Sequence, residues 1–561
     1  MTKQLIECVP NFSEGRDSKT IEAIANAIKQ VSGVQLLNID PGKATNRTVY
    51  TFVGPPDNVV EAAFFAIKKA SELIDMSKHT GEHPRMGATD VCPLIPVSGI
   101  SMEETVEYAK KLARCVADEL HIPIYLYEAA AIVPERKNLA TIREGEYEGL
   151  AKKINLPEWK PDYGNAEFNS KSGATVIGAR DFLIAYNINL NTKSTRIANA
   201  IAFDVREYGR VKRIGHPLLG EIEKDTEGNP VRIPGTLKSV KAIGWYIEEY
   251  GIAQISMNLT DVKLSPVHQV FEEVNDKART RGVRVTGSEI VGMVPKKVLI
   301  DAGEYFLEKQ KRSIGVSEDE IIQIAIKSLG LNDIAPFKPE KRIIEYMLEM
   351  DNNDPLNELS IKEFANLTAS EAAAPGGGSI AAYAGVLGAS LGTMVANLSA
   401  NKRGWEEKLT YFSSIAQKGQ GIKDRLLKLV DEDTRAFNRV MTAFGMAKTT
   451  DEEKQLRKNA IQQANIYAAK VPFQTMETAF EAFEIIKEMA ENGNPNSITD
   501  AGVGALCTHI AIEGAYFNVK VNAGGIDDET IKNNFIQKGK ELVEKAKVKE
   551  AEILIIVNSK L

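Results

Sequence analysis

The residues His79 to Gly87 (HTGEHPRMG) form the densest group of side chains that could carry out chemistry. They match the H-x-x-E-H pattern of a class of zinc proteases, which requires a helix to bring both histidines to one metal. Gly81 weakens a helix and Pro84 favours an extended conformation at His83, so the two rings need not converge. The alternatives are a loop that presents one imidazole as a general base, with Arg85 holding a carboxylate, and a histidine without a chemical role.

A glycine-rich run opens an alanine-rich apolar stretch in the C-terminal half of the chain. The run consists of Gly376, Gly377, Gly378 and Ser379. Free backbone amides at a helix start could meet a ligand, and the missing Gly-Lys-Ser/Thr ending excludes a P-loop. A tight helix start explains the run equally well. Three further glycines, at positions 385, 388 and 392, favour close packing against a neighbouring helix or against a second copy of the chain.

An acidic run, Asp431 to Asp433, lies inside a predicted amphipathic helix. Asp433 precedes the apolar Phe437 by four positions, so we expect it near the buried side, where a raised pKa would make it an acid. Asp431 is expected to be solvated and to pair with Arg435, which is the usual explanation of such a run.

The composition is that of a globular protein, with 43% hydrophobic and 26% charged residues among 561. A formal net charge of −7 provides no overall basic field, which disfavours nucleic-acid binding as the main activity. The four cysteines form no C-x-x-C pair, as is typical of a reducing compartment. The N-terminus lacks the apolar stretch of a secretory signal, and the uncharged run 380–400 is too rich in polar residues and glycine to predict a membrane span. We therefore expect a cytoplasmic protein that binds neither nucleic acid nor membrane.

Proline usage divides the chain into two architectures, because 19 of the 22 prolines precede residue 360. In the first part the order strand, helix, strand, strand, helix, strand occurs twice, over residues 5–97 and 182–295, which predicts two ferredoxin-like βαββαβ halves. After it, apolar residues three and four apart predict an all-α domain of at least five helices. The predicted divisions are 1–178, 179–335, a linker at 336–358 and a helical domain at 359–561, with Arg213–Pro234 as an excursion from the second half.

Several longer motifs resemble folate enzymes. Glutamate formiminotransferase is closely resembled by residues 5–15 (LIECVPNFSEG), 46–56 (NRTVYTFVGPP), 81–96 (GEHPRMGATDVCPLIP) and 182–190 (FLIAYNINL). Formimidoyltetrahydrofolate cyclodeaminase is resembled by residues 373–379 (AAPGGGS), 433–437 (DTRAF) and 515–522 (AYFNVKVN). The order of the two parts resembles the bifunctional formiminotransferase-cyclodeaminase family, and the resemblance covers almost the whole chain.

The resemblance implies two reactions of histidine degradation. A formimino group passes from N-formimino-L-glutamate to the co-substrate tetrahydrofolate, in mono- or polyglutamylated form, and the product then closes to 5,10-methenyltetrahydrofolate with release of ammonia. His83 is implied as the base of the transfer and Asp433 as the acid of the ring closure, without a metal. The implied folate segment is Gly164, Asn165, Ala166, Glu167, Phe168, Asn169, Ser170, Lys171, Ser172 and Gly173. The other implied binding residues are Asp40, Arg47, Arg85, Gly376, Gly377, Gly378, Ser379, Asn496 and Asp500.

Three alternatives stay open on the sequence alone. The helical domain also resembles methenyltetrahydrofolate cyclohydrolases, although its fusion to the transferase favours deamination. One site could be inactive, which would leave that domain as a binding or assembly module. A zinc hydrolase would use the paired histidines. In each case we expect small-molecule substrates and a homo-oligomer.

Overall fold

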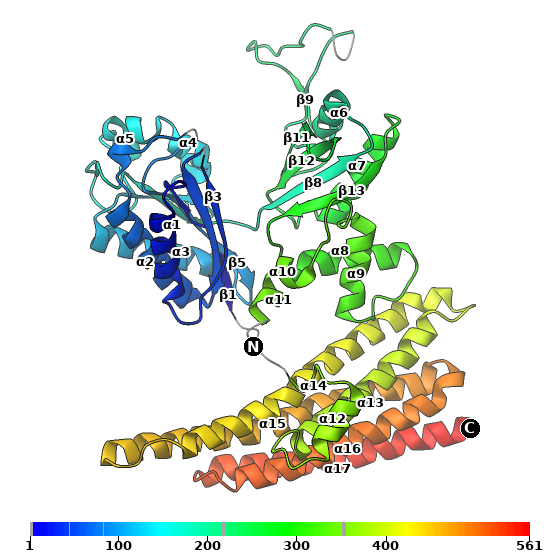
Figure 1. Ribbon diagram of the computed structural model, residues 1–561. Helices are drawn as coiled ribbons and strands as arrows, with labels where there is room; N and C mark the ends of the chain where they lie inside the picture. The colour runs from blue at the N-terminus through cyan, green and yellow to red at the C-terminus, as the bar shows by residue number, and fades with distance from the viewer. Residues whose placement is uncertain (1–3, 44, 82–83, 216–219, 350–354) are drawn as a thin grey trace. The chain divides into compact units, whose positions relative to one another are not determined.

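The computed structural model describes residues 4–43, 45–81, 84–215, 220–349 and 355–561 (Figure 1). The chain forms two compact units, Met1–Val298 with Leu331–Leu348 and Leu299–Gly330 with Glu349–Leu561. The first unit is mainly α/β and the second is helical, which confirms the predicted fold class. The helical unit also includes Leu299–Gly330, a stretch that the sequence pattern groups with the α/β part.

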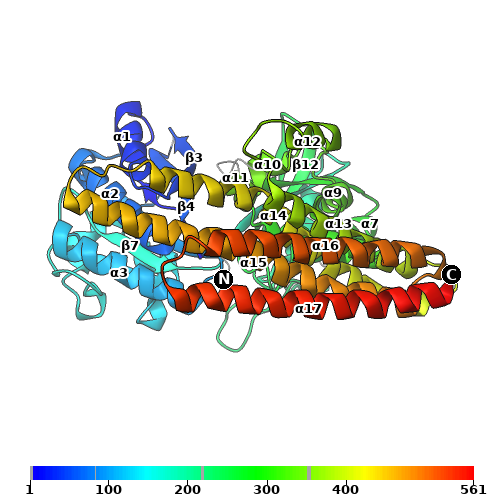
Figure 2. The same ribbon diagram turned by 90° about the horizontal axis from the view of Figure 1, so that it is seen from below.

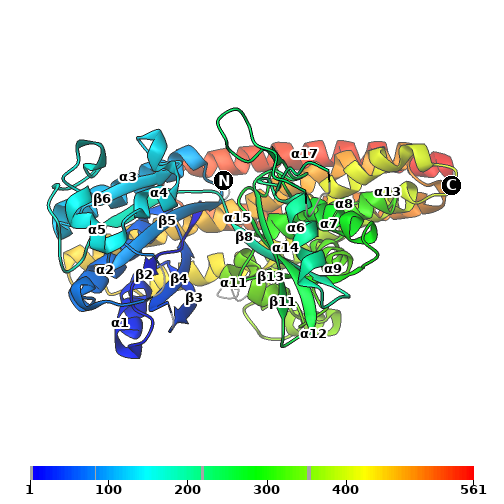
Figure 3. The same ribbon diagram turned by 90° about the horizontal axis from the view of Figure 1, so that it is seen from above.

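A seven-stranded sheet organises the first half of the α/β unit. Its strands are β1 (Leu5–Cys8), β2 (Asn11–Phe12), β3 (Gln35–Gly42), β4 (Arg47–Gly54), β5 (Thr89–Ser98), β6 (Ile124–Glu128) and β7 (Thr175–Ala179). The accompanying helices are α1 (Ser18–Lys29), α2 (Pro56–Leu73), α3 (Met102–Leu120), α4 (Leu139–Arg143) and α5 (Glu146–Lys153). Strand β3 pairs with β4, both β1 and β2 pair with β4 and β5, and β7 lies between β5 and β6. Figure 3 labels strands β2 to β6 of this sheet.

The elements β1, α1, β3, β4, α2 and β5 form the expected ferredoxin-like core, whose pairings are antiparallel. Three further elements, α3, β6 and β7, extend this core beyond the prediction. Strands β5, β7 and β6 are parallel, and parallel strands need a crossover, which α3 supplies between β5 and β6. The β6–β7 connection of this extension carries the predicted folate segment, residues 164–173.

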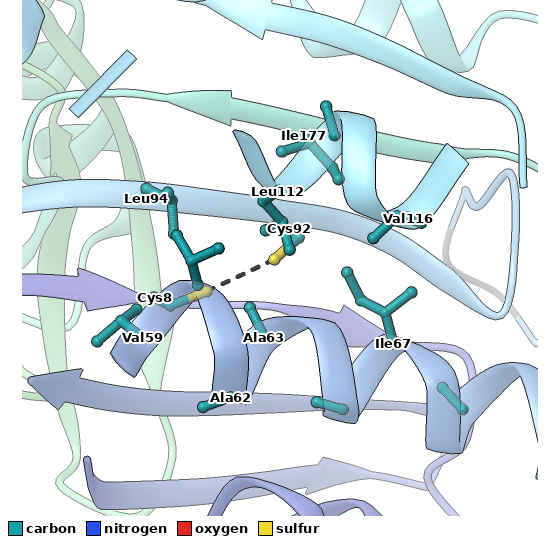
Figure 4. Close-up of a cluster of buried hydrophobic side chains, with 14 of the residues drawn as sticks. Cys8, Val59, Ala62, Ala63, Ile67, Cys92, Leu94, Leu112, Val116 and Ile177 are labelled. Atoms are coloured by element: carbon teal, nitrogen blue, oxygen red, sulfur yellow. Dashed lines mark hydrogen bonds between the residues drawn. The ribbon is translucent and has the colours of Figure 1, made fainter. Parts of the chain in front are cut away.

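The core of this half lies between one face of the sheet and the helices α1 to α3. Strand alternation points Ile6 and Cys8 into this core, where both are fully buried. Figure 4 shows the thiols of Cys8 and Cys92 in contact among aliphatic side chains, with their sulfurs 3.5 Å apart. The same alternation places Glu7 on the opposite face, where only 3% of its surface is exposed.

The second half of the α/β unit contains a four-stranded antiparallel sheet in the order β11-β12-β8-β13. Its strands are β8 (Ile184–Leu190), β11 (Val240–Ile247), β12 (Ile252–Leu259) and β13 (Val285–Val291), and its helices are α6 (Thr195–Val205) and α7 (Val267–Arg279). This order is the ferredoxin-like one, as predicted. A two-stranded ribbon of β9 (Arg210–Val211) and β10 (Arg232–Ile233) forms the base of the predicted excursion.

The remaining elements are helices, and the five longest, α13 to α17, run alongside one another (Figures 1 and 2). The helices are α8 (Lys296–Lys309), α9 (Glu318–Leu329), α10 (Pro339–Arg342), α11 (Ile344–Glu349), α12 (Ile361–Thr368), α13 (Gly377–Ala400), α14 (Leu409–Phe444), α15 (Asp451–Asn492), α16 (Ile498–Ala523) and α17 (Glu529–Lys560). Polar caps begin several of them: Thr450 and Glu453 form a capping box at α15, and Asp528 caps α17.

The glycines of α13 are packed inside the bundle. A Cβ atom at Gly388 would lie 2.4 Å from Oγ1 of Thr508, and one at Gly392 would lie 3.0 Å from Ile486. The glycine spacing therefore lets α13 approach helices of its own chain closely. Packing of α13 against a second copy stays a prediction. Helix α13 is long and apolar enough to cross a membrane, but 61% of its most apolar window is buried within the bundle.

Candidate functional site

A cavity of about 320 Å³ opens among the four helices α13 to α16. The first turn of α13 contributes Gly377 and Gly378, and the middle of α14 contributes Asp433 and Phe437. Helices α15 and α16 supply the opposite wall. The structure thus brings two of the predicted motifs, the glycine run and the acidic run, into one pocket.

Asp433 is held against the start of α13. The hydroxyl of the fully buried Ser379 lies 3.2 Å from Oδ2 of Asp433 and 2.9 Å from the carbonyl oxygen of Val430, and it can donate to either oxygen. A Cβ atom at Gly378 would lie 2.2 Å from Oδ1 of Asp433, so this position leaves no room for a side chain. Burial raises the pKa of the Asp433 carboxyl, while the hydrogen bonds from Ser379 lower it by less. Ser379, expected to touch a ligand, therefore contacts the predicted acid.

Asp431 differs from its prediction. It is 2% exposed, and its carboxylate accepts hydrogen bonds from the backbone amides of Leu356 and Asn357, at 3.0 and 3.2 Å. The expectation of a solvated side chain is wrong because the chain that precedes α12 folds back over α14, which the helical periodicity of α14 alone does not reveal. Asp431 anchors that segment to the bundle.

Two predicted binding residues lie away from this pocket. Asn496 is exposed, and Asp500 lies in the first turn of α16, whereas the pocket is formed by the last two turns of the same helix. At about 1.5 Å per residue, Asp500 is roughly 27 Å from the pocket residue Asn518 along the helix axis. Within one chain, Asn496 and Asp500 are therefore not part of the site around Asp433.

In the α/β unit, the predicted folate segment contacts the strand that follows the histidine motif. The carbonyl oxygen of Ser172 accepts from the amide of Ala88 at 2.8 Å, and Gly173 forms a bridge with Gly87. A Cβ atom at Gly173, whose φ is +66°, would lie 2.1 Å from the carbonyl oxygen of Met86, so only glycine fits there. The segment is thereby fixed beside the motif.

The earlier part of the folate segment faces outward. Residues 164–168 are exposed, and the ring of Phe168 lies 5.5 Å from that of Tyr147 in α5. The side chain of Asn169 stabilises the turn by accepting hydrogen bonds from the amides of Lys171 and Ser172, at 3.2 and 2.9 Å. The hydroxyl of Tyr147 donates a hydrogen bond to the carbonyl oxygen of Ser170. The structure therefore presents an exposed loop, with a buried end, that a ligand can reach.

Arg85 is engaged by protein carboxylates. It is buried, and its guanidinium pairs with Glu146 at 2.9 Å and with Glu148 at 2.6 Å, both in α5. Its Nε donates to Nδ1 of His79 at 3.3 Å, and Nε2 of His79 lies 2.9 Å from the carbonyl oxygen of Asn46. Because only an N–H can face that oxygen, both ring nitrogens of His79 are in use, which argues against a zinc site built on this histidine. His83 and Glu82 lie outside the described residues.

Arg47 and Asp40 occupy different surroundings. Arg47, half-buried at the start of β4, donates to Oδ1 of Asn11, and burial lowers its pKa. It lies close to the ion pair formed by Asp90 and Arg143. Asp40 is exposed on β3. Arg47 is thus part of a polar cluster at the sheet, whereas Asp40 is open to solvent.

Comparisons with known proteins identify the family to which the chain belongs. Family descriptions match in three stretches: the N-terminal subdomain of the formiminotransferase domain over residues 5–180, the formiminotransferase domain over 185–349 and formiminotransferase-cyclodeaminase over 360–541. Formimidoyltransferase-cyclodeaminase from Gallus gallus is 43% identical over 558 residues, which cover 99% of each chain. The chain belongs to the formiminotransferase-cyclodeaminase family.

Two relatives named for a single activity are each similar to only part of this formiminotransferase-cyclodeaminase family member. Glutamate formimidoyltransferase from Streptococcus pyogenes serotype M1 is 42% identical over 305 residues, covering 54% of this chain and 94% of that protein. Methenyltetrahydrofolate cyclohydrolase from Methylorubrum extorquens is 35% identical over 202 residues, covering 36% of this chain and 97% of that protein. Both kinds of relative agree with the resemblances found in the motifs.

Three polar residues of the family member's pocket are not among the predicted binding residues. They are Asn465, Asn518 and Asn522, which line the wall formed by α15 and α16. Asn518 and Asn522 lie in the motif 515–522 that carries the cyclodeaminase resemblance, and their spacing of four residues places both on one face of the helix. Asn465 has no such signal, because it joins the pocket only through the packing of α15 against α16.

Proposed function

We propose that the chain carries out both reactions of its family. The α/β part transfers the formimidoyl group between N-formimidoyl-L-glutamate and tetrahydrofolate, and the helical bundle closes 5-formimidoyltetrahydrofolate to 5,10-methenyltetrahydrofolate and releases ammonia. The observation that carries this proposal is the full-length match to the bifunctional relatives, joined to a buried carboxyl of raised pKa in a pocket of the bundle. We also propose the domain division at residues 178, 335 and 358. The first and last of these boundaries are supported by the matched stretches, which cover residues 5–180, 185–349 and 360–541.

For the transfer, we assign the base to His83. A neutral imidazole takes the proton of N5 of the folate as that nitrogen attacks, and returns it to the departing nitrogen of glutamate. This assignment is supported by two backbone hydrogen bonds, because the carbonyl oxygens of Lys171 and Ser172 accept from the amides of Met76 and Ala88, which flank the histidine motif in the sequence. Lys171 has an exposed side chain in that segment and supplies a cation for a substrate carboxylate.

For the ring closure, we assign the acid to Asp433. N10 of the folate attacks the formimidoyl carbon, the bond from this carbon to the terminal nitrogen breaks, and one proton moves from N10 to that nitrogen, which leaves as ammonia. A carboxyl with a raised pKa can hold this proton between the two nitrogens and ends in its starting state. Because the attack is intramolecular, a pocket that holds the folate bent supplies much of the acceleration.

Basic residues next to the pocket suit the anionic tail of folate, in mono- or polyglutamylated form. A second cavity of about 340 Å³ is lined by Lys448, Lys454, Arg457 and Lys458. Gln462, which also lines it, donates at 3.2 Å to the carbonyl oxygen of Gly525, a residue of the first pocket. The two cavities therefore share a wall, and glutamate carboxylates would leave the first pocket toward these cations.

We further propose a homo-oligomer in the cytoplasm. Apolar side chains are exposed along α13 at positions 380, 387, 394 and 398, and along α16 at 503, 506 and 510. These two helices pack against each other, so their stripes favour burial against a second copy. The four cysteines are free thiols, which suits a reducing compartment.

The test is incubation with N-formimidoyl-L-glutamate and tetrahydrofolate, followed by ammonia and by the absorbance of the methenyl product. His83→Ala should slow transfer by about 10² to 10⁴ and leave deamination of supplied 5-formimidoyltetrahydrofolate intact. The exposed His121, at the end of α3, provides the matched control His121→Ala. Hydrolysis of methenyltetrahydrofolate without ammonia release would favour the cyclohydrolase alternative, and no reaction at the bundle would favour an assembly module.

A further inference from the structure

Two stripes of exposed apolar side chains form one face of the helical bundle. Spacings of three, four or seven residues place the members of each stripe on one side of their helix. The two helices pack side by side, and α15 lies on the other side of both, since a Cβ atom at Gly392 or Gly504 would meet Ile486. The stripes therefore join into a single surface, the α13/α16 face. It consists of Ile380, Leu387, Met394 and Leu398 on α13 and Val503, Leu506, Ile510, Phe517 and Val521 on α16.

The exposed area of the α13/α16 face fits a second copy of the chain. Each of its side chains is between 37% and 77% exposed. At about 100 Å² for a half-exposed large side chain, the face leaves roughly 900 Å² of apolar surface in water. A stable interface buries about 800 Å² on each partner, and in a two-fold dimer the same face serves both copies. The face is therefore large enough to hold two copies together.

Contacts between α13 and α16 fix which residues lie at the same height along the two helices. A Cβ atom at Gly388 would lie 2.4 Å from Thr508 and one at Gly377 would lie 3.6 Å from Asn518, so the helices run antiparallel. By this pairing Leu506 lies level with the centre of the α13 stripe. The centre of the α16 stripe lies about 8 Å further along, at about 1.5 Å per residue.

These heights decide how the two-fold axis runs. An axis across the helices, at the level of Leu506, sets the α13 stripe against its own copy, with Ile380 against the partner's Leu398. An axis along the helices would set each α13 stripe against an α16 stripe that is displaced by about 8 Å, and Met394 and Leu398 would have no apolar partner. The axis across the helices buries more apolar surface and is therefore favoured.

The same axis brings the partner's turn between α15 and α16 to the pocket of Asp433. Asn518, which lines the pocket, lies about 17 Å from the axis, and the partner's Asn496 comes within about 2 Å of the same height. Asn496 is exposed, and its turn is held in place because the amide of Asn494 donates to Oγ of Ser399 at 2.8 Å. The turn of one copy therefore lies beside the pocket of the other.

We propose that the helical domain works as a two-fold dimer in which the partner's Asn496 closes the mouth of the Asp433 pocket. This inference rests on the proposed ring closure and the proposed homo-oligomer, and it names the residue that the second copy supplies. The side-chain amide of Asn496 brings donors and an acceptor to the bound folate. The partner's turn also shields the folate from water while the ring closes.

The test combines two impaired variants of the full chain. Asp433→Asn and Asn496→Ala should each release ammonia from supplied 5-formimidoyltetrahydrofolate at least about 10-fold more slowly than the wild type. Co-expressed with two different affinity tags and purified on both, they form mixed dimers in which one pocket carries both changes and the other carries neither. We expect about half of the wild-type rate from these dimers. Asn438→Ala, an exposed amide on α14, is the control and should keep the full rate.

If Asn496 served the pocket of its own chain, both pockets of a mixed dimer would be damaged. Absence of recovery in the mixed dimers, or a full rate for Asn496→Ala alone, would therefore overturn the proposal.

Cysteine cross-linking tests the axis independently of activity. Leu506→Cys lies beside the axis, so mild oxidation should give a covalent dimer on a non-reducing gel. Ile380→Cys, in the same face, would lie about 27 Å from its own copy and is the matched control, while the wild type gives the background from Cys507. Equal cross-linking of the two variants, or none by Leu506→Cys, would show that the axis is wrong. Failure of the wild type to release ammonia would refute the ring closure, whereas the cross-link would still report the dimer.

Discussion

Gly378→Ala is expected to disable ring closure by moving the acid. The new Cβ atom would lie 2.2 Å from Oδ1, 2.5 Å from Cγ and 2.6 Å from Oδ2 of Asp433, whereas ordinary contacts are about 3.4 Å. The carboxyl group must therefore withdraw by about 1 Å and lose its alignment with Ser379. A misplacement of about 1 Å in a catalytic group costs about 10²-fold in rate. At Gly377 the nearest atom is 3.6 Å away, so the same change there should cost far less.

The assay is the initial rate of ammonia release from supplied 5-formimidoyltetrahydrofolate, with kcat and KM separated. The loss should appear in kcat, while transfer in the α/β part stays unchanged. Gly421→Ala is the control, because it lies on the same helix as Asp433 and a Cβ atom there has no heavy atom within 4 Å. If Gly378→Ala keeps a kcat within threefold of Gly421→Ala at equal thermal stability, the contact with Asp433 does not govern the reaction.

Three further substitutions test the roles of buried groups. Asp433→Asn should lower ammonia release by about 10² to 10⁴, measured against Asp424→Asn on the same helix, and similar mild effects would remove Asp433 from the mechanism. Ser379→Ala removes a hydrogen bond that lowers the pKa of Asp433, so the decline of kcat at high pH should move to higher pH, and an unmoved profile would contradict this. Glu7, in β1, has a pKa raised to about 7 by burial, so its contribution to stability is present below pH about 4.5 and is lost as pH rises through 7. At about 1.4 kcal/mol per pH unit, the free energy of unfolding should fall by about 3 kcal/mol between pH 5 and pH 8 in the wild type, and Glu7→Gln should remove this difference. Hydrogen exchange of the β1 amides at the two pH values measures it, and a difference that persists in the variant would show that another group titrates.

The periodic part of the fold could be predicted from the sequence. Alternation in runs such as LIECVPNF, and helical spacing between them, express which face of each element is buried, and both ferredoxin-like cores follow from that pattern. The extension α3–β6–β7 could not be read in the same way. Strands β6 and β7 are short and pair in parallel with partners far along the chain, so no turn signal marks them.

A site residue could be predicted only where its environment is set by the helix or strand on which it lies. Asp433 follows from its place on the apolar side of α14 and shows the raised pKa expected of it. Asp431, two positions earlier, depends on Leu356 and Asn357, and Asn465 depends on the packing of α15 against α16. Those dependences are tertiary, and a pattern within one helix contains no information about them.

The connection from β6 to β7, residues 129–174, is one continuous stretch between two paired strands of the sheet. Both of its ends are fixed by parallel strand pairing, and it carries α4, α5 and the loop that contacts the histidine motif. The ferredoxin-like frame beneath it has its own core between α1 to α3 and the sheet. Exchanging this one stretch for that of a relative would therefore replace an exposed surface together with the partners of Arg85. It would also replace buried residues, because Ala130 belongs to the frame's core, and Ile142 and Leu150 pack against Val91 in a second core.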